Sequence, residues 1–408
     1  MALDPVTNPY TPGAGQRPAL LSGRDQELQD FRARLQRLER GRAAQCTLIV
    51  GLRGVGKTVL LNTFGQEAVR RDWVVVEHEL TARGDLLATL ARVAHQALLE
   101  LSPPSRWTRA TRRAGAILRS MEISYEIAGL SVSLPTADVG DALPASGDPA
   151  RDVTELLLAL GSAAAEHQRG VTLMFDELQF APIEPLGALV AGLHKVAQRD
   201  LPLTIVAAGL PQTRGVLAEA ATYSERMFET RTVGALTEAD AKRALAEPAA
   251  DEGVAIADAA LSEAVRFTEG YPFFLQVFGD HLWRLASGDR ITEDDALRAG
   301  PMVREWLDRG FFTFRTDRLP TAQRRYLRAM AELGSHEQAS GDIATALGLS
   351  SSAPVGQTRD ALIRRGLIYS PRLGYAAFTV PQFDDYLRRH FELEAHVPRR
   401  RAADDSDG

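Results

Sequence analysis

The chain has 408 residues, 45% of them hydrophobic and 25% charged, and carries a formal net charge of −6. This composition is that of a globular protein, and the length predicts two or three domains, since a single core rarely grows beyond about 250–300 residues. One cysteine excludes a disulfide framework. No apolar run approaches the ~20 residues of a membrane span, and the first 21 residues are not typical of a signal peptide. We therefore expect a cytoplasmic protein without a membrane partner.

The charge is distributed unevenly along the chain. Residues 303–403 contain 16 arginines and 11 acidic residues, a local balance of +5, so the rest of the chain is strongly acidic. A basic C-terminal third on an acidic body is what an anion-binding module would show.

The N-terminal region predicts an arm and then a helix. Residues 1–20 are rich in Pro and Gly, which favours an extended arm. Ser22 is an expected N-cap, with Asp25 three residues later. The apolar positions of the expected helix are Leu28, Phe31, Leu35 and Leu38.

Residues 51–58 read Gly-Leu-Arg-Gly-Val-Gly-Lys-Thr and follow the apolar strand 47–50. This spacing is that of a phosphate-binding loop, in which glycines let backbone N–H groups surround phosphate oxygens. The lysine reaches the β- and γ-phosphates, the threonine offers a hydroxyl to Mg²⁺, and the helix that follows points its positive end at the anion. The predicted nucleotide contacts are Gly51, Gly54, Val55, Gly56, Lys57, Thr58 and Val59. The sequence therefore predicts a protein that binds a nucleoside triphosphate.

Further apolar strands alternate with helices along the chain. They are expected at 73–77, 171–176, 203–208 and 228–233, with an amphipathic helix at 84–101. Strands that are apolar across their whole width indicate a parallel sheet covered on both faces. The expected fold class is α/β, a three-layer αβα core of the P-loop NTPase type over residues 21–234.

A second motif closes the strand 171–176. Asp176 stands at its carboxyl end, where a parallel sheet places its ligand crevice, and with Thr58 it can hold Mg²⁺. Glu177 follows and can polarise the attacking water, as general-base catalysis requires. Strands often end in acidic residues, so this motif alone is a weak indication of a metal site. The phosphate-binding loop upstream strengthens the prediction.

Residues 102–150 interrupt the alternation and predict an insertion. A basic helical patch comprises Arg106, Arg109, Arg112 and Arg113. It can contact nucleic acid or form a solvated helix face. Residues 123–126 and 130–134 are expected to pair as a hairpin, followed by a flexible loop at 135–150.

The last third predicts two helical regions and a tail. Residues 235–312 are expected to be helical with a break at 270–272, and the resemblance described below implies that they form a lid. Residues 313–395 show the order helix, helix, turn, helix, two-stranded ribbon, which is typical of a winged helix. Its third helix would present Gln357, Arg359 and Arg364 to double-stranded DNA, with Arg372 at the wing tip. Many winged helices bind proteins instead, and the acidic Asp360 lies on the same helix. Residues 396–408 are an expected disordered tail.

Over residues 20–395 the chain resembles the AAA-type P-loop ATPases of the origin-recognition-like and archaeal-type group, which couple an ATPase core and lid to a C-terminal winged helix. The resemblance rests on several short segments besides 51–58. Residues 23–28 (Gly-Arg-Asp-Gln-Glu-Leu) resemble the GRxxEL motif that members of this group place beside adenine. Gly270-Tyr271-Pro272 is similar to the Gly-x-Pro motif of the signal-transducing ATPases with numerous domains. The other segments are 175–179, 208–211 and 223–228.

The resemblance implies roles for further residues. Arg24 would lie beside adenine, and Pro272 and Tyr271 would help to seat the base and sense it in the lid. The alternative for the latter is a helix break caused by the proline, with Tyr271 and Phe273 in the core. Arg226 would approach the γ-phosphate from its own or a neighbouring subunit of a homo-oligomer. Alternatively, Arg226 forms a surface ion pair with Glu225. The second candidate for the arginine that approaches the γ-phosphate is Arg214. The resemblance and the absence of an Asn-Lys-x-Asp motif imply ATP rather than GTP.

One feature departs from this group. Its members usually carry a polar sensor residue near the end of the fourth strand, whereas here that strand ends in Ala207-Ala208-Gly209. Two functions stay open. One is a Mg²⁺-dependent ATPase whose nucleotide state controls DNA engagement. The other is a regulatory ATP switch with slow turnover, whose winged helix binds a protein partner.

Overall fold

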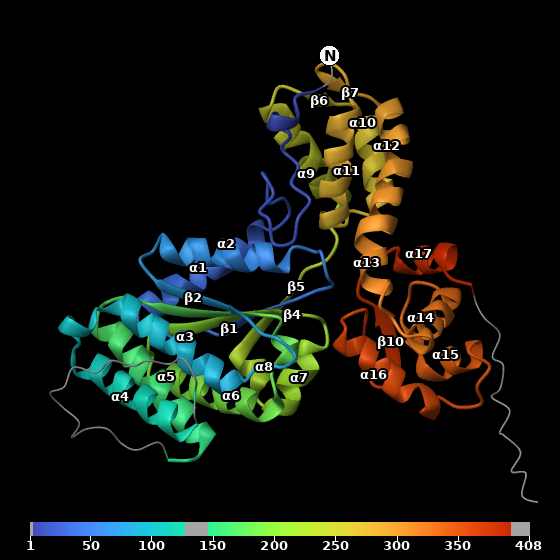
Figure 1. Cartoon of the computed structure of the whole chain (residues 1–408). Coiled ribbons are helices and arrows are strands. Elements are labelled where there is room, and N and C mark those ends of the chain that lie inside the picture. The colour runs from blue at the N-terminus through green and yellow to red at the C-terminus, as the bar shows by residue number, and fades with distance from the viewer. Residues whose placement is uncertain (1–2, 126, 128–145, 393–408) are drawn as a thin grey trace, which may run out of the picture. The chain divides into compact units, whose positions relative to one another are not determined.

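The computed structural model describes residues 3–125, 127 and 146–392. It divides into two compact units, Met1–Val303 and Arg304–Gly408 (Figure 1). The predicted tail at 396–408 and the second hairpin strand at 130–134 lie outside the described residues. No helix of the described part is long and apolar enough to cross a membrane.

The first unit is built on a parallel sheet of five strands. They are β1 (Cys46–Val50), β2 (Val74–Glu79), β3 (Val171–Asp176), β4 (Leu203–Gly209) and β5 (Phe228–Thr232), in the spatial order β2-β3-β4-β1-β5. Every residue of β1, β3 and β4 is buried, as expected for strands covered on both faces. All five strands are parallel, so their carboxyl ends share one edge, and β1 and β4 are neighbours there.

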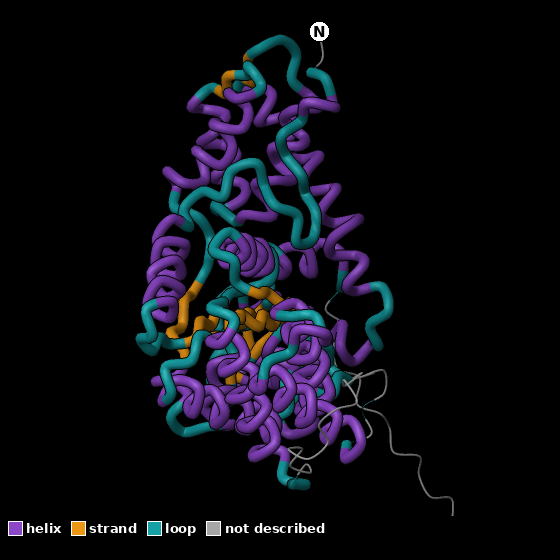
Figure 2. Tube along the Cα trace, turned by 90° about the vertical axis from the view of Figure 1, so that its left-hand side faces the viewer, coloured by secondary structure: helices purple, strands orange, loops and turns teal. Residues whose placement is uncertain are grey.

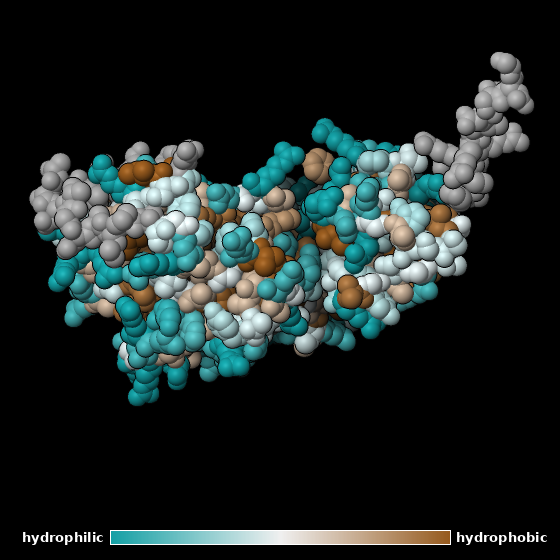
Figure 3. Space-filling model, turned by 90° about the horizontal axis from the view of Figure 1, so that it is seen from below, coloured by the Kyte–Doolittle hydropathy of each residue, from teal (hydrophilic) through white to brown (hydrophobic). Residues whose placement is uncertain are grey.

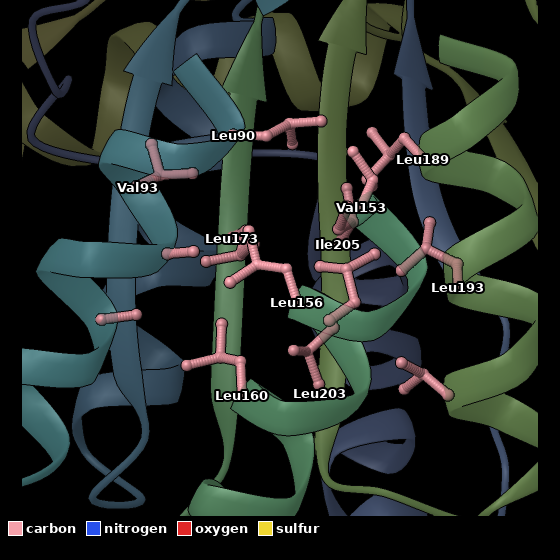
Figure 4. Packing of buried hydrophobic residues seen from close by; sticks show 14 of the residues in the cluster. Leu90, Val93, Val153, Leu156, Leu160, Leu173, Leu189, Leu193, Leu203 and Ile205 are labelled. Atoms are coloured by element: carbon pink, nitrogen blue, oxygen red, sulfur yellow. The ribbon is translucent and has the colours of Figure 1, made fainter. Parts of the chain in front are cut away.

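Helices cover both faces of this sheet, whose strands form the orange layer of Figure 2. Figure 1 shows α1 (Asp25–Glu39) and α2 (Lys57–Val69) on one face, and α3 (Leu86–Leu101), α5 (Pro149–Glu166) and α6 (Ile183–Gln198) on the other. The core between α3, α5, α6 and the strands is aliphatic (Figure 4). The side chains labelled there are Leu90, Val93, Val153, Leu156, Leu160, Leu173, Leu189, Leu193, Leu203 and Ile205. The predicted α/β class and three-layer core are confirmed.

The insertion adds a helix, α4 (Arg109–Ser124), which packs against α3 and α5. The predicted hairpin is wrong at its first strand, because Ile123 and Ser124 are the last residues of this helix. The reason is tertiary: Ile117, Leu118 and Met121 of α4 are buried against the core, so the helix continues through the β-branched residue that favoured a strand.

Four helices in the region expected to be a lid follow β5 and the short helices α7 (Thr213–Ala220) and α8 (Ser224–Met227) that precede it. The lid comprises α9 (Glu238–Asp251), α10 (Asp258–Thr268), α11 (Pro272–Leu285) and α12 (Glu293–Trp306), with a short parallel pair β6 (Ala255–Ile256) and β7 (Arg290–Ile291). Gly270 takes a positive φ of 69°, and Pro272 is the first residue of α11. A proline is favourable at this position because its missing N–H would have no partner in the helix.

The N-terminal arm packs on the lid (Figure 1). The Tyr10 ring is buried, and its hydroxyl donates to the carbonyl oxygen of Leu245 at 2.6 Å. The indole of Trp283 donates to the carbonyl oxygen of Asp4 at 2.9 Å. Ser22 does not cap α1, which begins at Asp25 after the N-cap residue Arg24. The Ser22 hydroxyl is instead buried, without a hydrogen-bond partner among the described residues.

The second unit contains short helices and a small sheet. Its elements are a π-helical stretch Leu307–Phe312, α13 (Thr313–Thr316), α14 (Thr321–Leu333), β8 (Gln338–Ala339), α15 (Ser340–Ala346), α16 (Gly356–Arg364), β9 (Ile368–Tyr369), β10 (Tyr375–Phe378) and α17 (Phe383–His390). The sheet is antiparallel with the order β8-β10-β9. The buried residues of this unit include Tyr326 of α14, Ile343 of α15 and Leu362 of α16. On the face seen in Figure 3, apolar residues occur in small groups among polar ones.

Candidate nucleotide site

The loop between β1 and α2 has the backbone that a phosphate-binding loop needs. Gly54 and Gly56 have φ of 87° and 91°, in the left-handed region that favours glycine. A Cβ on Gly51 would lie 2.3 Å from the carbonyl oxygen of Val233, so only glycine fits there. Of the two predicted valines, Val55 is buried and Val59 is half-buried on the first turn of α2. The loop ends at Lys57, where the free N–H groups of the first helical turn begin.

Lys57 is nearly buried inside this loop. Its ammonium donates to the carbonyl oxygen of Leu52 at 2.9 Å. Burial lowers the pKa of Lys57, while the nearby carboxylates of Glu177 and Asp176 act in the opposite direction. A cation held in low dielectric is stabilised by an anion, and the phosphates of a nucleotide would supply one.

Two oxygen ligands for a cation meet beside the loop. The Thr58 hydroxyl donates to the Asp176 carboxylate at 2.6 Å, although 118 positions separate them in sequence. The other oxygen of Asp176 accepts the N–H of Glu177 at 2.7 Å. Among the described residues, no group of three or more His, Cys, Asp or Glu side chains could hold a metal ion. A hydroxyl and a carboxylate that meet in this way fit Mg²⁺, which binds few protein oxygens and keeps water and phosphate ligands.

Glu177 adopts an unusual backbone conformation directly after β3. Its φ of 55° and ψ of 40° place it in the left-handed region, which is uncommon for a residue other than glycine. Its carboxylate accepts a hydrogen bond from the side-chain amide of Gln179. Residues held in such conformations cluster at functional sites, so the geometry is consistent with a reacting carboxylate.

Arg226 lies at the opposite edge of the sheet from the loop. It precedes β5, whose first residue Phe228 pairs with Cys46, the first residue of β1. The five residues of β1 span about 16 Å, which is further than an arginine side chain extends. Its side chain is 82% exposed, with a 3.7 Å contact to Glu225. Arg226 is therefore exposed at the amino edge of the sheet, and its side chain does not reach the phosphate-binding loop of its own chain.

Arg214 lies on the same edge as the loop. It belongs to α7, which follows β4, and it donates to the hydroxyl of Thr232 at the end of β5. The structure therefore brings the second candidate arginine, rather than the first, to the carboxyl edge of its own sheet.

Arg24 is used within the fold. One of its terminal nitrogens donates to the carbonyl oxygen of Gly234 at 2.7 Å, and the other donates to that of Gly23 at 3.3 Å. Burial lowers the pKa of Arg24, while the nearby carboxylates of Glu27 and Asp240 raise it and only partly offset that effect. The guanidinium thus ties the start of α1 to the segment between β5 and the lid.

Tyr271, expected beside the base, and Phe273, expected in the core, both contact the backbone of the phosphate-binding loop. The Tyr271 hydroxyl donates to the carbonyl oxygen of Arg53, and the Phe273 N–H donates to that of Gly54 at 3.2 Å. A Cβ on Gly54 would lie 3.0 Å from the Tyr271 ring. Pro272 lies between these two residues, at the start of α11. The break at 270–272 was the feature of the sequence that pointed to this segment, and it does not specify which surface the segment contacts.

The four predicted DNA contacts of the second unit fall into two pairs. Gln357 and Arg364 of α16 are exposed. Arg359 instead donates to the Ser370 hydroxyl at 2.8 Å and to the carbonyl oxygen of Tyr375 at 3.0 Å. Arg372 lies 3.6 Å above the Tyr375 ring and 3.4 Å from the Glu337 carboxylate. Of the basic insertion patch, Arg113 pairs with Glu155 at 2.6 Å.

Comparisons with known proteins agree with this geometry. Residues 20–206 match the family model of the AAA ATPase domain. Residues 309–387 match a model described as "Domain of unknown function (DUF8462)". A sequence search of curated proteins found no match. Residues 20–206, which contain the loop, Thr58 and Asp176, are therefore similar to an AAA ATPase domain.

Three solved structures are similar to the chain at low sequence identity. A Walker-type ATPase of Pyrococcus abyssi is 17% identical with a TM-score of 0.53, over 91% of this chain and 97% of that chain. The Aeropyrum pernix Orc1 protein in complex with DNA is 17% identical with a TM-score of 0.41, over 91% and 94%. The Thermotoga maritima RuvB Holliday junction branch migration motor is 14% identical with a TM-score of 0.46, over 94% and 100%. The likeness to the Pyrococcus ATPase shows a common fold.

Proposed function

We propose that the protein is a cytoplasmic, Mg²⁺-dependent ATPase whose nucleotide state controls engagement of double-stranded DNA through a C-terminal winged helix. The observation that carries the proposal is the meeting of Lys57, Thr58, Asp176 and Glu177 at the carboxyl edge of the sheet. Each supplies one of the functions that hydrolysis of a phosphoanhydride requires.

The loop and Lys57 would hold the β- and γ-phosphates of ATP. Thr58 and Asp176 would hold Mg²⁺, which when bound neutralises charge on these phosphates. Glu177 would accept a proton from a water whose oxygen attacks the γ-phosphorus, while the bond to the bridging oxygen breaks and ADP leaves. Arg226 of a neighbouring subunit would stabilise the transition state, which makes a homo-oligomer part of the proposal.

A path from the site to the second unit is present in the chain. Tyr271 and Phe273 connect the loop to α11. The last lid helix, α12, runs past Val303, where the first unit ends. A change in the loop on hydrolysis would therefore act on the lid, and the lid is continuous with the proposed DNA-binding unit.

The DNA part of the proposal rests on the second unit alone. What supports this part is the order of helices and strands, with an antiparallel pair after the third helix, because winged helices have such an order. Gln357 and Arg364 are exposed on that helix, in the basic third of the chain. A slow regulatory switch with a protein partner is the second candidate, and the internal contacts of Arg359 and Arg372 favour it.

The test is ATP turnover by the purified protein with and without duplex DNA, combined with DNA binding across a salt series. We expect DNA to stimulate turnover, and binding to weaken steeply as salt rises, because phosphate contacts release counterions. Unchanged turnover with no binding at low salt would overturn the DNA-coupled function. Tight nucleotide binding with negligible turnover would favour the switch.

A further inference from the structure

The side-chain amide of Gln179 connects two strand ends. Gln179 lies in a short 3-10 turn, Leu178–Phe180, directly after β3. Its Nε2 donates to the Glu177 carboxylate, and its Oε1 accepts the N–H of Leu210 at 3.1 Å. Leu210 follows the last residue of β4. One amide therefore uses both its donor and its acceptor to tie the proposed base to the neighbouring strand.

The end of β4 is shaped to admit this amide. A Cβ on Gly209 would lie 2.8 Å from Oε1 of Gln179 and 2.3 Å from the hydroxyl oxygen of Thr213. The carbonyl oxygen of Gly209 accepts the N–H of Gly51, the first residue of the phosphate-binding loop, at 3.2 Å. The amide thus reaches a strand end that is bonded to the loop itself.

The orientation of the Glu177 carboxylate decides whether it can act as a base. A general base must lie within hydrogen-bond reach of the water whose proton it accepts. A carboxylate without a fixed hydrogen bond can adopt several orientations, and only some of them meet this requirement. The Gln179 hydrogen bond restricts the rotation and orients the carboxylate, and misplacement of a reacting group by about 1 Å can cost on the order of 10²-fold in rate.

We infer that Gln179 is a positioning residue, which orients the Glu177 carboxylate for the attacking water and couples it to the end of β4. The inference rests on the proposed ATPase function, because it assigns a role within that reaction.

The experiment compares three variants with the wild type. Gln179→Glu keeps the size and the acceptor toward Leu210 but replaces the donor, and Gln179→Met removes both hydrogen bonds. Gln198→Glu, on the exposed surface of α6, is the matched control. We measure kcat and KM for Mg²⁺-ATP, and in nucleotide-free protein the hydrogen-exchange rate of the Leu210 amide.

In both Gln179 variants we expect kcat to fall by about 10–100-fold, within the range of general-base contributions, and KM to change by less than about 3-fold. Exchange at Leu210 should accelerate in Gln179→Met and stay near the wild-type rate in Gln179→Glu. The Gln198→Glu control should match the wild type throughout.

Two results would overturn the inference while leaving the ATPase proposal intact. One is wild-type kcat in both Gln179 variants alongside a Glu177→Gln variant that has lost turnover. The other is a fall in kcat matched by an equal loss of nucleotide affinity, since Gln179 would then support the loop as a whole. Absence of wild-type turnover that depends on Glu177 would instead remove the proposed function itself, and the inference with it.

Discussion

The phosphate-binding edge of the first unit and the third helix of the second unit use their charged residues in different ways. At the edge, Lys57 and Asp176 are nearly buried, and their hydrogen bonds are 2.9 Å and 2.6 Å long. On α16, Arg364 is exposed, while Arg359 holds the turn between β9 and β10. Buried charges need partners, so the first arrangement is fixed before any ligand binds. An exposed arginine carries no such requirement, and its position alone does not define a partner.

The largest effect should come from Lys57→Ala, with Lys195→Ala on the surface of α6 as the matched control. Loss of the ammonium removes a charge-assisted bond to phosphate, so nucleotide affinity should fall by about 10–100-fold. Turnover should fall on the order of 10³-fold or more, because the same charge stabilises the transition state. Fluorescent-nucleotide titration and phosphate release measure the two. Wild-type turnover in Lys57→Ala would remove the basis of the comparison.

Arg226→Ala tests whether the exposed arginine next to β5 belongs to the nucleotide site of a second subunit. Turnover should fall on the order of 10³-fold with nucleotide affinity unchanged, as for other arginines that act in trans. Mixing Arg226→Ala with Lys57→Ala should restore part of the activity, since each subunit supplies what the other lacks. Arg266→Ala, which removes an exposed side chain of α10, is the control and should leave turnover unchanged. Equal loss in pure and mixed samples would contradict a role in trans.

Arg364→Ala addresses the second unit. If α16 contacts DNA, affinity should fall by about 5–10-fold and the slope of log affinity against log salt should decrease by about 1. Arg318→Ala, exposed before α14, is the control. Fluorescence anisotropy with duplex DNA gives both quantities. An unchanged slope would mean that this arginine does not reach phosphate and would strengthen the case for a protein partner.

The smallest effect concerns an ion pair that supports the fold rather than the site. Glu67 of α2 bonds Arg32 of α1 at 2.7 Å. That hydrogen bond lowers the pKa of the Glu67 carboxyl from its ordinary value. The stability it contributes is therefore fully present above the ordinary carboxyl pKa of about 4.3 and is lost as pH falls below it.

Glu67→Gln should accordingly destabilise the protein by about 1 kcal/mol or less at pH 7, since Arg32 is half-exposed. The difference from wild type should shrink below about pH 4.3, where the Glu67 carboxyl of the unfolded chain binds a proton before that of the folded protein does. Urea denaturation at several pH values measures it. A difference that grows as the solution becomes more acidic would have the wrong sign.

The sequence predicted those parts of the molecule that depend on local chemistry. Glycine spacing specified the loop, and apolar runs ending at Asp176 and Gly209 specified strands whose carboxyl ends share an edge. Expectations that depended on distant contacts were less successful. Ser22 was expected to cap α1, and Ile123 was expected in a strand, and neither prediction was right. Both predictions used local preferences, which tertiary packing overrides.

Two contacts had no local signal at all. The hydrogen bond that docks Tyr10 on the lid joins residues 235 positions apart. The contact of Gln179 with Leu210 requires β3 and β4 to be neighbours and a 3-10 turn to aim the amide. The first unit therefore shows which residues a motif can specify, and which ones only the packed sheet brings together.

The central claim is that Glu177 acts as the base of an ATP hydrolase, and turnover of Mg²⁺-ATP by the wild type and by Glu177→Gln tests it most directly. Nucleotide affinity is measured in the same samples. We predict that the variant binds ATP as tightly as the wild type and that its turnover falls by about 10²–10⁴-fold, the usual contribution of a general base. Equal turnover in the two proteins would contradict the account.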